Sequence, residues 1–578
     1  MNMQLRRRIC FASLMFLFTS IGTVQSAKTI AGNVVFTRFG IAVELEEGVS
    51  IKELSVLEVT AASAAERIEN RHSLIQTVVA FGDKRFLIQF AWEPHKTYRI
   101  KTQWGDGCRF DASVTAPLKP SAHPIRTIEL DDLLSLFENL QRPAKATTVA
   151  FSPDGEKLAI ATDAGHLAII NPLTGEKIWK TRISESYTKH AAFSSDGRRL
   201  YIGEQSADGF VYAYKLSGKK PALLWKYRMA DDINTSTPYR PNDVYAWVQY
   251  PGPYRIAVTE NGDLLVAGVH SWTQDGAALK KSQLYRFDGE TGKLKWKWPS
   301  GKPLPMIIRW FDYSRDGKSI AVVYDTISSR ASPQFQPGTL CVIDGVSGAK
   351  RWEYAFEPLK PHFEAVKFWR GVGVSPDGKF INVTTEDGRA FIFDAVNAAH
   401  GKVDPLWQAE LTTPLEVSDV PITATSGTIA ATNSFALFVT GDTYIPYHLQ
   451  KGAQQPPAAH PNGLTLFAYK WTGEKAWRWA LQNMPQGLRV DARNRYAAVS
   501  ISKASRNGEE QLHGVSLFDL NATGGGLAKY LYTYRVEGQL PYDTIDISVA
   551  GQYIALIEIP IVMPDETTRG KNRVHIIQ

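Results

Sequence analysis

Cysteine is scarce in this chain, with three residues among 578. Cys10 lies in a leader that we expect to be removed, and Cys108 and Cys341 lie in different predicted domains, so neither a disulfide framework nor a thiolate zinc site is expected. The haem motif Cys-x-x-Cys-His is absent, as are the serine-hydrolase elbow, the His-Glu-x-x-His helix and the phosphate-binding loop. Because no catalytic motif occurs, we do not expect an enzyme.

A strong net charge is also missing, since 65 Lys and Arg residues balance 58 Asp and Glu residues to give +7. Arg6, Arg7 and Arg8 precede an apolar run at Ile9–Ile21, which predicts a secretory leader over residues 1–26, cut after Ser26. Without these three arginines the charge is about +4, which is too mild to indicate nucleic-acid binding. The apolar run is too short for a transmembrane span. We therefore predict a periplasmic or secreted protein of a bacterial-type envelope.

What the chain does contain is a recurring unit. Its first copy reads VAFSPDG at Val149–Gly155, continues through an apolar run at Leu158–Ala161, and ends with PLTGEKIW at Pro172–Trp179. Asp-Gly and Asn-Gly are typical of tight hairpin turns because these residues tolerate positive φ. A unit of roughly 40 to 60 residues cannot bury its own apolar face, so the copies must stack, as the blades of a propeller do.

The first turn of the unit recurs along the chain at Asp154-Gly155, Asp196-Gly197, Asn261-Gly262, Asp316-Gly317 and Asp377-Gly378, with weaker equivalents at Ser426-Gly427, Arg493-Asn494 and Ala550-Gly551. These turns predict an all-β, eight-bladed β-propeller over residues 146–578. Seven blades are the alternative, because the copy around Ile422–Thr432 is degenerate. The last copy, Thr544–Gln578, has only three strands, so we expect Ile125–Leu130 to add the fourth and close the ring.

Two parts of the repeat resemble known families. VAFSPDG resembles a WD-type repeat, and FDGETGKLKW at Phe287–Trp296 resembles the tryptophan-docking repeat of quinoprotein dehydrogenases and their cofactor-free relatives. The resemblance covers about residues 125–578 and implies a propeller, with the tryptophans packed between blades. The cofactor-free relatives commonly act as assembly or interaction scaffolds.

The dehydrogenases of this family hold pyrroloquinoline quinone (PQQ) with calcium or a lanthanide among Glu, Asn and Asp side chains, commonly beneath a disulfide of adjacent cysteines. This chain has no Cys-Cys pair, and no acidic cluster stands out at a matching blade position. We therefore expect no cofactor. A PQQ-dependent dehydrogenase with calcium remains the alternative that the resemblance leaves open.

Residues 27–120 show a different pattern, without a convincing helix. Alternating segments predict strands at Asn33–Leu45, Ser55–Thr60, Ile75–Phe81, Phe86–Ala91, Thr97–Gln103 and Phe110–Thr115. Trp92–Tyr98 resembles the tyrosine-corner phrase of immunoglobulin-like and fibronectin-like sandwiches, in which a tyrosine hydroxyl bonds the backbone a few residues upstream. We predict a small β-sandwich, followed over residues 121–145 by a linker, the closing strand and a short helix at Asp131–Leu140.

Long insertions mark one face of the predicted ring. They occur at Met229–Tyr254, His270–Lys281, Asp325–Gly338, Gly441–Asn462, Ser502–His513 and Pro560–Asn572, all in connections that emerge on the same side of a propeller. Insertions gathered on one face are typical of the binding side of a repeat protein. Exposed aromatic residues suit partner binding there, and the candidates are Trp247, Tyr250, Trp272 and Tyr447. The alternative is that they pack on one another to stabilise the loops.

A second group of candidates lies where the innermost strands begin. Counting back from each turn glycine gives His190, Arg255, Arg309, Trp310, Trp369 and Arg370, which we expect to surround the mouth of the central channel. Arginine beside aromatic residues suits carboxylates, phosphates or planar anions. The alternative is that each arginine pairs with a loop acid such as Asp231, Asp232 or Asp312. We predict a scaffold that binds a protein partner through its looped face, with small-anion binding at the channel mouth as the alternative.

Overall fold

The computed structural model describes most of the chain after the predicted leader. The described residues are 28–46, 54–62, 77–80, 84–104, 108–130, 146–184, 187–217, 220–235, 250–274, 277–326, 337–396, 403–446, 449–503, 512–521, 529–563 and 565–578. They are almost entirely β-strands, with one four-residue helix, α1 (Ala230–Ile233), in this part of the chain. The all-β prediction is confirmed. The predicted leader and the predicted helix at Asp131–Leu140 lie outside the described residues.

The N-terminal strands form two antiparallel sheets. One contains, in spatial order, β1 (Gly32–Thr37), β2 (Gly40–Leu45), β5 (Arg85–Gln89) and β4 (Thr77–Ala80). The other contains β3 (Leu54–Ala62), β6 (Thr97–Trp104) and β7 (Arg109–Thr115). The prediction of a single strand over Asn33–Leu45 is wrong, because Arg38 and Phe39 form a two-residue turn between β1 and β2. Both turn residues contact the domain that follows. The centroids of the Phe39 and Tyr496 aromatic rings lie 6.4 Å apart.

These two sheets enclose a shared apolar core, in which Phe86, Tyr98 and Trp104 are fully buried. The hydroxyl of Tyr98 accepts a hydrogen bond from the backbone N–H of Glu93 at 2.8 Å. That is the contact expected from the tyrosine-corner phrase. The membership of this domain in an immunoglobulin-like or fibronectin-like family remains a prediction.

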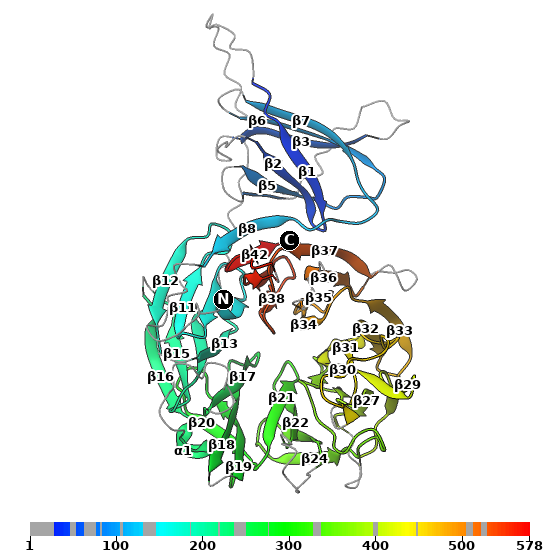
Figure 1. The fold of residues 1–578 in the computed structure, drawn as a ribbon. Coiled ribbons are helices and arrows are strands. Elements are labelled where there is room, and N and C mark those ends of the chain that lie inside the picture. The colour runs from blue at the N-terminus through cyan, green and yellow to red at the C-terminus, as the bar shows by residue number, and fades with distance from the viewer. Residues whose placement is uncertain are drawn as a thin grey trace, which may run out of the picture.

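The strands after β8 (Pro124–Glu129) form sheets that follow one another around a central axis (Figure 1). The first sheet contains β9 (Ala146–Phe151), β10 (Leu158–Thr162), β11 (His166–Ile170) and β12 (Lys177–Arg182). The second contains β13 (Tyr187–Phe193), β14 (Arg199–Gln205), β15 (Phe210–Lys215) and β16 (Ala222–Arg228). The third contains β17 (Gly252–Val258), β18 (Leu264–Gln274), β19 (Ala277–Phe287) and β20 (Leu294–Trp298). The fourth contains β21 (Ile307–Tyr313), β22 (Ser319–Asp325), β23 (Thr339–Asp344) and β24 (Lys350–Ala355).

The remaining sheets complete the ring. The fifth contains β25 (Val372–Val374), β26 (Phe380–Thr384), β27 (Arg389–Asp394) and β28 (Trp407–Glu410). The sixth has five strands, β29 (Leu415–Val417), β30 (Val420–Ala431), β31 (Phe435–Tyr444), β32 (Thr465–Lys470) and β33 (Lys475–Ala480). The seventh contains β34 (Pro485–Val490), β35 (Tyr496–Ile501), β36 (His513–Asp519) and β37 (Tyr530–Val536). The last contains β38 (Ile545–Ile547), β39 (Ile554–Glu558), β42 (Arg573–Ile577) and β8, and a separate hairpin of β40 (Ile561–Val562) and β41 (Thr568–Arg569) extends from it.

Small antiparallel sheets arranged around an axis define a β-propeller, so the prediction of a propeller is confirmed. One predicted turn is wrong. Ser426 and Gly427 lie inside β30, and the turn of the sixth sheet falls at Thr432–Phe435, where the N–H of Thr432 donates to the carbonyl of Phe435. Gly427 serves a close approach instead, because a Cβ at this position would lie 2.5 Å from the carbonyl oxygen of Trp369.

The last sheet joins the two ends of the ring. β8 pairs antiparallel with β42, so that Ile128 lies opposite Val574, and the strand before the first sheet completes the final one. The N-terminal sheets pack against this junction, where Leu87 shares an apolar cluster with Ile128 and Val574. Arg85 also donates a hydrogen bond of 3.0 Å to the carbonyl of Pro124. The N-terminal domain therefore rests on the sheet that closes the ring.

Tryptophans dock several of the sheets onto a turn of the next. The indole N–H of Trp225 donates to the carbonyl of Gly289 at 3.2 Å, and that of Trp296 donates to the carbonyl of Gly345 at 2.9 Å. A Cβ on Gly348 would lie 2.8 Å from the ring of Trp296, so only glycine fits beneath the indole. These tryptophans pack between blades, as the docking repeat implied.

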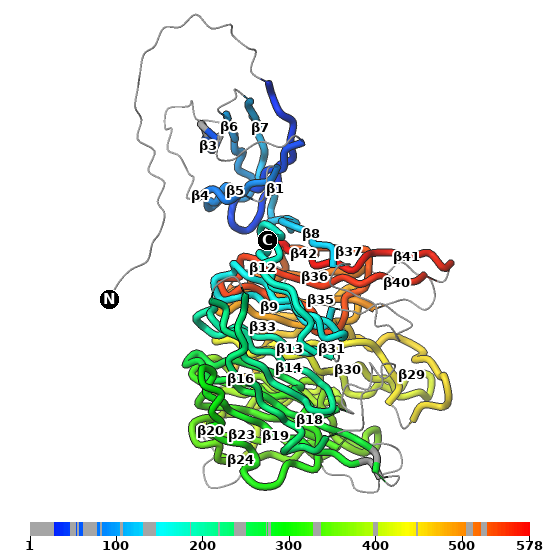
Figure 2. The backbone as a smooth tube through the Cα atoms, turned by 90° about the vertical axis from the view of Figure 1, so that its left-hand side faces the viewer, coloured from blue at the N-terminus to red at the C-terminus, as the bar shows by residue number. Residues whose placement is uncertain are grey.

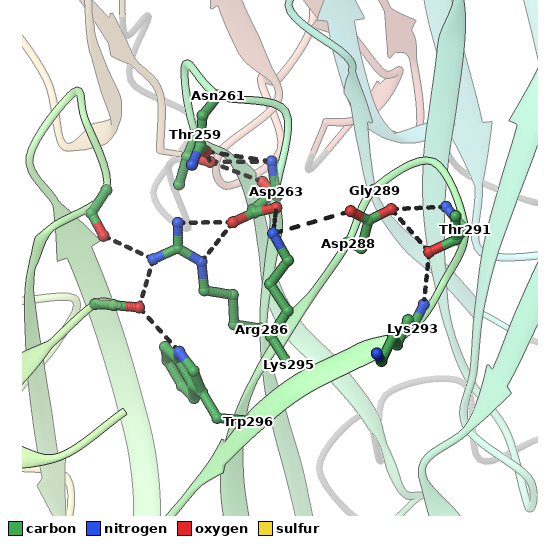
Figure 3. Close-up of polar contacts among 12 residues, drawn as sticks. Thr259, Asn261, Asp263, Arg286, Asp288, Gly289, Thr291, Lys293, Lys295 and Trp296 are labelled. Atoms are coloured by element: carbon green, nitrogen blue, oxygen red, sulfur yellow. Dashed lines mark hydrogen bonds and ion pairs between the residues drawn. The ribbon is translucent and has the colours of Figure 1, made fainter. Parts of the chain in front are cut away.

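A buried ion cluster supports the same junction between the third and fourth sheets (Figure 3). Arg286 donates to Asp263 at 2.8 Å and to the carbonyls of Gly317 and Gly345 in the fourth sheet. The second carboxylate oxygen of Asp263 binds the Lys295 ammonium at 2.5 Å. Each of these charged groups is bound by a backbone carbonyl in a turn or by an opposite charge, so the cluster is structural.

Candidate functional site

Three successive inner strands carry a β-bulge at the same place. The pairing register shifts between Thr188 and His190 in β13, between Pro253 and Arg255 in β17, and between Ile308 and Trp310 in β21. A bulge inserts one extra residue and can redirect its side chain. The extra residues are Lys189, Tyr254 and Arg309, and all three line one central cavity.

The bulge residues belong to a larger set. Counting back eight positions from a turn glycine reaches Lys189, Tyr254, Arg309, Arg370 and Asp543 in five different sheets. All five line the cavity. Arg309 and Arg370 were predicted from the sequence to lie at the channel mouth, whereas Lys189, Tyr254 and Asp543 were not, although a count of eight reaches all five.

The cavity has a volume of about 890 Å³ and is lined by residues from each of the eight sheets. Among its lining residues are all six candidates from the starts of the inner strands, namely His190, Arg255, Arg309, Trp310, Trp369 and Arg370. Trp369 is 55 % exposed and therefore marks an open end of the cavity. The structure brings these six residues together.

The aromatic candidates from the insertions do not converge in the same way. Tyr250 is only 7 % exposed, because Pro251 and Gly252 press its segment against the second sheet at Gly209 and Glu204; the expectation that it is exposed is wrong. Trp272 is half-buried and stacks on His270 with ring centroids 4.4 Å apart. Trp247 and Tyr447 lie outside the described residues.

An ion pair spans the channel. The guanidinium of Arg370, which precedes β25, lies 2.6 Å from the carboxylate of Asp543, which precedes β38 three sheets further along the ring. Both residues have left-handed backbones, with φ of 61° for Arg370 and 62° for Asp543. Arg489 binds the other carboxylate oxygen of Asp543 at 2.7 Å. Burial would raise the pKa of Asp543, but the charges of Arg370 and Arg489 lower it to about 2.

Trp310 lies between two arginines. The Arg255 guanidinium is 4.3 Å and the Arg370 guanidinium 4.4 Å from the centre of its ring. The Arg370 guanidinium is also 4.2 Å from the ring centre of Tyr542. Such cation–π contacts strengthen where water is excluded, so the aromatic rings hold the arginines in place.

Acidic side chains pair with the remaining arginines. Arg255 binds Asp312 at 3.1 Å, and Arg309 binds Asp325 at 2.8 Å. The second oxygen of Asp312 accepts the backbone N–H of Val374 in the next sheet at 2.8 Å. The cavity is therefore lined by arginine–aspartate pairs and not by a uniformly basic collar. Of the three acids expected as partners, only Asp312 has this role, since Asp231 binds Arg228 and Asp232 binds Lys297.

Hydrogen-bond donors exceed acceptors at the open end. Arg309 uses its Nε for Asp325, and the structure gives its two terminal nitrogens no acceptor among the described residues. The Nε of Arg370 is buried, and no described residue bonds to it. The ring of His190 hydrogen-bonds the backbone of Tyr254, so its buried Nε2 is an acceptor when the ring is neutral. Burial lowers the pKa of His190 well below its usual value, so its ring is neutral. Buried donors normally find acceptors, and an acceptor from outside would complete these groups.

The opposite end of the channel is bridged by the turns. Arg315, in the turn after β21, reaches across the ring to the carbonyl of Ala492 in the turn after β34. Its backbone N–H donates to Pro376 at 3.0 Å, and its carbonyl accepts from Glu260 at 3.2 Å. These contacts link the turns of different sheets, so ligand access is favoured at the end marked by Trp369.

That end belongs to the face on which the second-to-third strand and fourth-to-first strand connections emerge, called here the looped face. Figure 2 shows β29, β40 and β41 projecting on one side of the ring. Three elements of this face carry an exposed apolar side chain: Leu279 lies at the start of β19, Leu415 on β29 and Val562 on β40, the last 74 % exposed.

Two further classes of feature are missing from the part of the chain that the structure describes. It contains no group of three or more His, Cys, Asp or Glu side chains placed to hold a metal ion. It also contains no helix with the length and apolar character needed to cross a bilayer.

Comparison with known proteins agrees with this architecture. Residues 163–362 match the family model described as outer membrane protein assembly factor BamB. The repeats and sheets make the chain a β-propeller, and its residues 163–362 are similar to quinoprotein-type repeats, as the resemblance implied.

No curated protein sequence matches the chain. Among solved structures, hydrazine synthase of Kuenenia stuttgartiensis is similar over 75 % of this chain and 98 % of that chain, with 14 % identity and a TM-score of 0.38. A likeness this distant does not bear on function.

Proposed function

We propose that this protein is an exported β-propeller scaffold, acting without a cofactor, that binds a protein partner through its looped face. The role we infer is assembly or an accessory function in a bacterial-type envelope. The family model matched by residues 163–362 is named for outer-membrane protein assembly, which supports a role of that kind. The leader predicted over residues 1–26 supports export.

The observation that carries the proposal is the exposure of Leu279, Leu415 and Val562 on separate projecting elements of one face. Isolated apolar side chains on a protein surface are ordinary, but here three separate elements of the same face each carry one. Aromatic and apolar anchors at the centre of an interface contribute most of its binding energy. Trp369, at the open end of the channel, would lie at the centre of such an interface.

Co-purification from the envelope of the native cell tests the proposal. The tagged protein carrying Leu415→Asp with Val562→Asp should lose its partner, because charges placed in an apolar interface oppose its desolvation. A matched control carries Val346→Asp with Val549→Asp, two exposed residues in turns on the opposite face. The control should retain the partner. Equal recovery with both variants, or loss only with the control, would contradict the proposal.

A further inference from the structure

The open end of the channel combines three features of a ligand site. It contains a buried donor that no described residue accepts, the Nε of Arg370, together with arginines held against aromatic rings and residues with left-handed backbones. A left-handed backbone is uncommon for residues other than glycine, asparagine and aspartate, and it recurs at functional sites. Arg370 and Asp543 both adopt it.

The arrangement selects a carboxylate among anions. Asp543 already shows how the cavity binds this group, since its two oxygens are contacted by Arg370 at 2.6 Å and Arg489 at 2.7 Å. A phosphate dianion would bring more negative charge close to Asp312, Asp543 and Asp546, which line the same cavity. The planar fork of an arginine also matches a carboxylate in two-point contact.

Arg309 has the donors for such a contact. Its Nε is engaged by Asp325, which leaves the two terminal nitrogens for a second acceptor. It also lines the same cavity as Arg370, which belongs to the next sheet along the ring. A carboxylate between the two arginines would meet the unsatisfied donors from both sides.

We propose that an aspartate or glutamate side chain from an extended segment of the protein partner enters the channel through the looped face and binds between Arg309 and Arg370. The inference rests on the proposed function, because a partner docked on Leu279, Leu415 and Val562 covers this opening. A cavity of about 890 Å³ is larger than one carboxylate requires and has room for the residues beside it. Trp369, exposed at the rim, offers a flat surface to the backbone of that segment.

Binding of a short peptide to the purified protein tests the inference without the partner. The probe is a fluorescein-labelled, blocked seven-residue peptide with two glutamates, and its counterpart has glutamine at both places. Fluorescence anisotropy at low salt should show the glutamate peptide binding at least about tenfold more tightly, with the difference shrinking as salt is added. Equal affinity for the two peptides would overturn the inference.

Two variants and one matched control test where the peptide binds. Arg309→Gln with Asp325→Asn removes both charges of the pair while keeping groups that can hydrogen-bond, and should weaken the glutamate peptide by about tenfold or more. Arg351→Gln with Asp344→Asn, the same exchange in a pair on the opposite face, should leave binding unchanged. Trp369→Ala, a surface change that spares the fold, should weaken binding several-fold. Full binding by the first variant and by Trp369→Ala would overturn the assignment.

Competition by free glutarate distinguishes binding of a partner's side chain from binding of a small-molecule ligand. Glutarate should compete with the peptide only weakly, because it lacks the backbone that rests on Trp369. Competition as strong as that of the unlabelled peptide would overturn the assignment to a partner segment. If the peptide tests fail while the partner is still captured, only this inference is wrong. If the Leu415/Val562 and Val346/Val549 variants capture the partner equally well, the proposed function is wrong.

Discussion

Arg370 and Asp543 meet across the central channel, with 2.6 Å between guanidinium and carboxylate, although they lie just before the inner strands of the fifth and eighth sheets. The pair ties together parts of the ring that share no strand pairing. Because Arg489 binds the same carboxylate, Asp543 neutralises charge from two arginines at once. The mouth of the channel is therefore held in one geometry by its own charges.

Asp543→Asn should destabilise the protein strongly. Asparagine tolerates the left-handed backbone, so the change tests charge alone, and it leaves Arg370 and Arg489 without their shared carboxylate. We expect a loss of about 2 to 3 kcal/mol in the free energy of unfolding, measured by urea denaturation. Asp344→Asn removes a carboxylate from a more exposed pair with Arg351 and should cost less than about 1 kcal/mol. Equal losses would contradict the structural role given to Asp543.

Asp546 should make stability depend on pH. Burial raises the pKa of its carboxyl to about 6, while one of its oxygens accepts the backbone N–H of Phe151 at 2.8 Å. Since the folded pKa lies above the unfolded one, the carboxyl stabilises the fold when protonated, and this contribution is lost as the pH rises from about 4 through 6.

Asp546→Asn stays neutral and keeps an acceptor for Phe151. Its free energy of unfolding should therefore be about 1 to 2 kcal/mol higher than that of the unchanged protein at pH 8, and this difference should vanish near pH 4. Thermal unfolding of both proteins across this range measures the effect. A constant difference at every pH would show that the carboxyl does not titrate in this way.

Gly348 should be essential for docking between the third and fourth sheets. Its φ is 74° and an added Cβ would lie 2.8 Å from the Trp296 ring, whereas Gly262 has a φ of 86° with no atom within 4 Å of such a Cβ. Gly348→Ala and Gly262→Ala thus share the backbone cost and differ in the clash. We expect Gly348→Ala to lose about 1 kcal/mol more in urea denaturation. Equal losses would mean that the indole shifts without cost.

The repeat could be read from the sequence because its turns use Asp-Gly and Asn-Gly, which the backbone requires. The turn of the sixth sheet could not be placed in this way, since the turn at Thr432–Phe435 contains no glycine and Gly427 lies within a strand. The closing strand was expected at Ile125–Leu130 and the structure has β8 at Pro124–Glu129, because an incomplete last sheet needs a strand from elsewhere.

The candidate site could be predicted only in part. Counting back seven to nine residues from the turn glycines brought out the arginines and tryptophans that line the cavity. Their acidic partners could not be assigned in the same way, because the pairing of Arg370 with Asp543 depends on how far each side chain reaches across the channel. The burial of Tyr250 depends on contacts with the second sheet, which no local pattern in the sequence records.

Hydrogen–deuterium exchange on the complex with its captured partner tests the central claim most directly. The account predicts slower exchange in the complex at the start of β19, in the β29–β30 hairpin and in the β40–β41 hairpin. It predicts unchanged exchange in the turns of the opposite face, around Gly317 and Gly348. Protection confined to those turns, or to the N-terminal sheets, would contradict a scaffold that binds through its looped face.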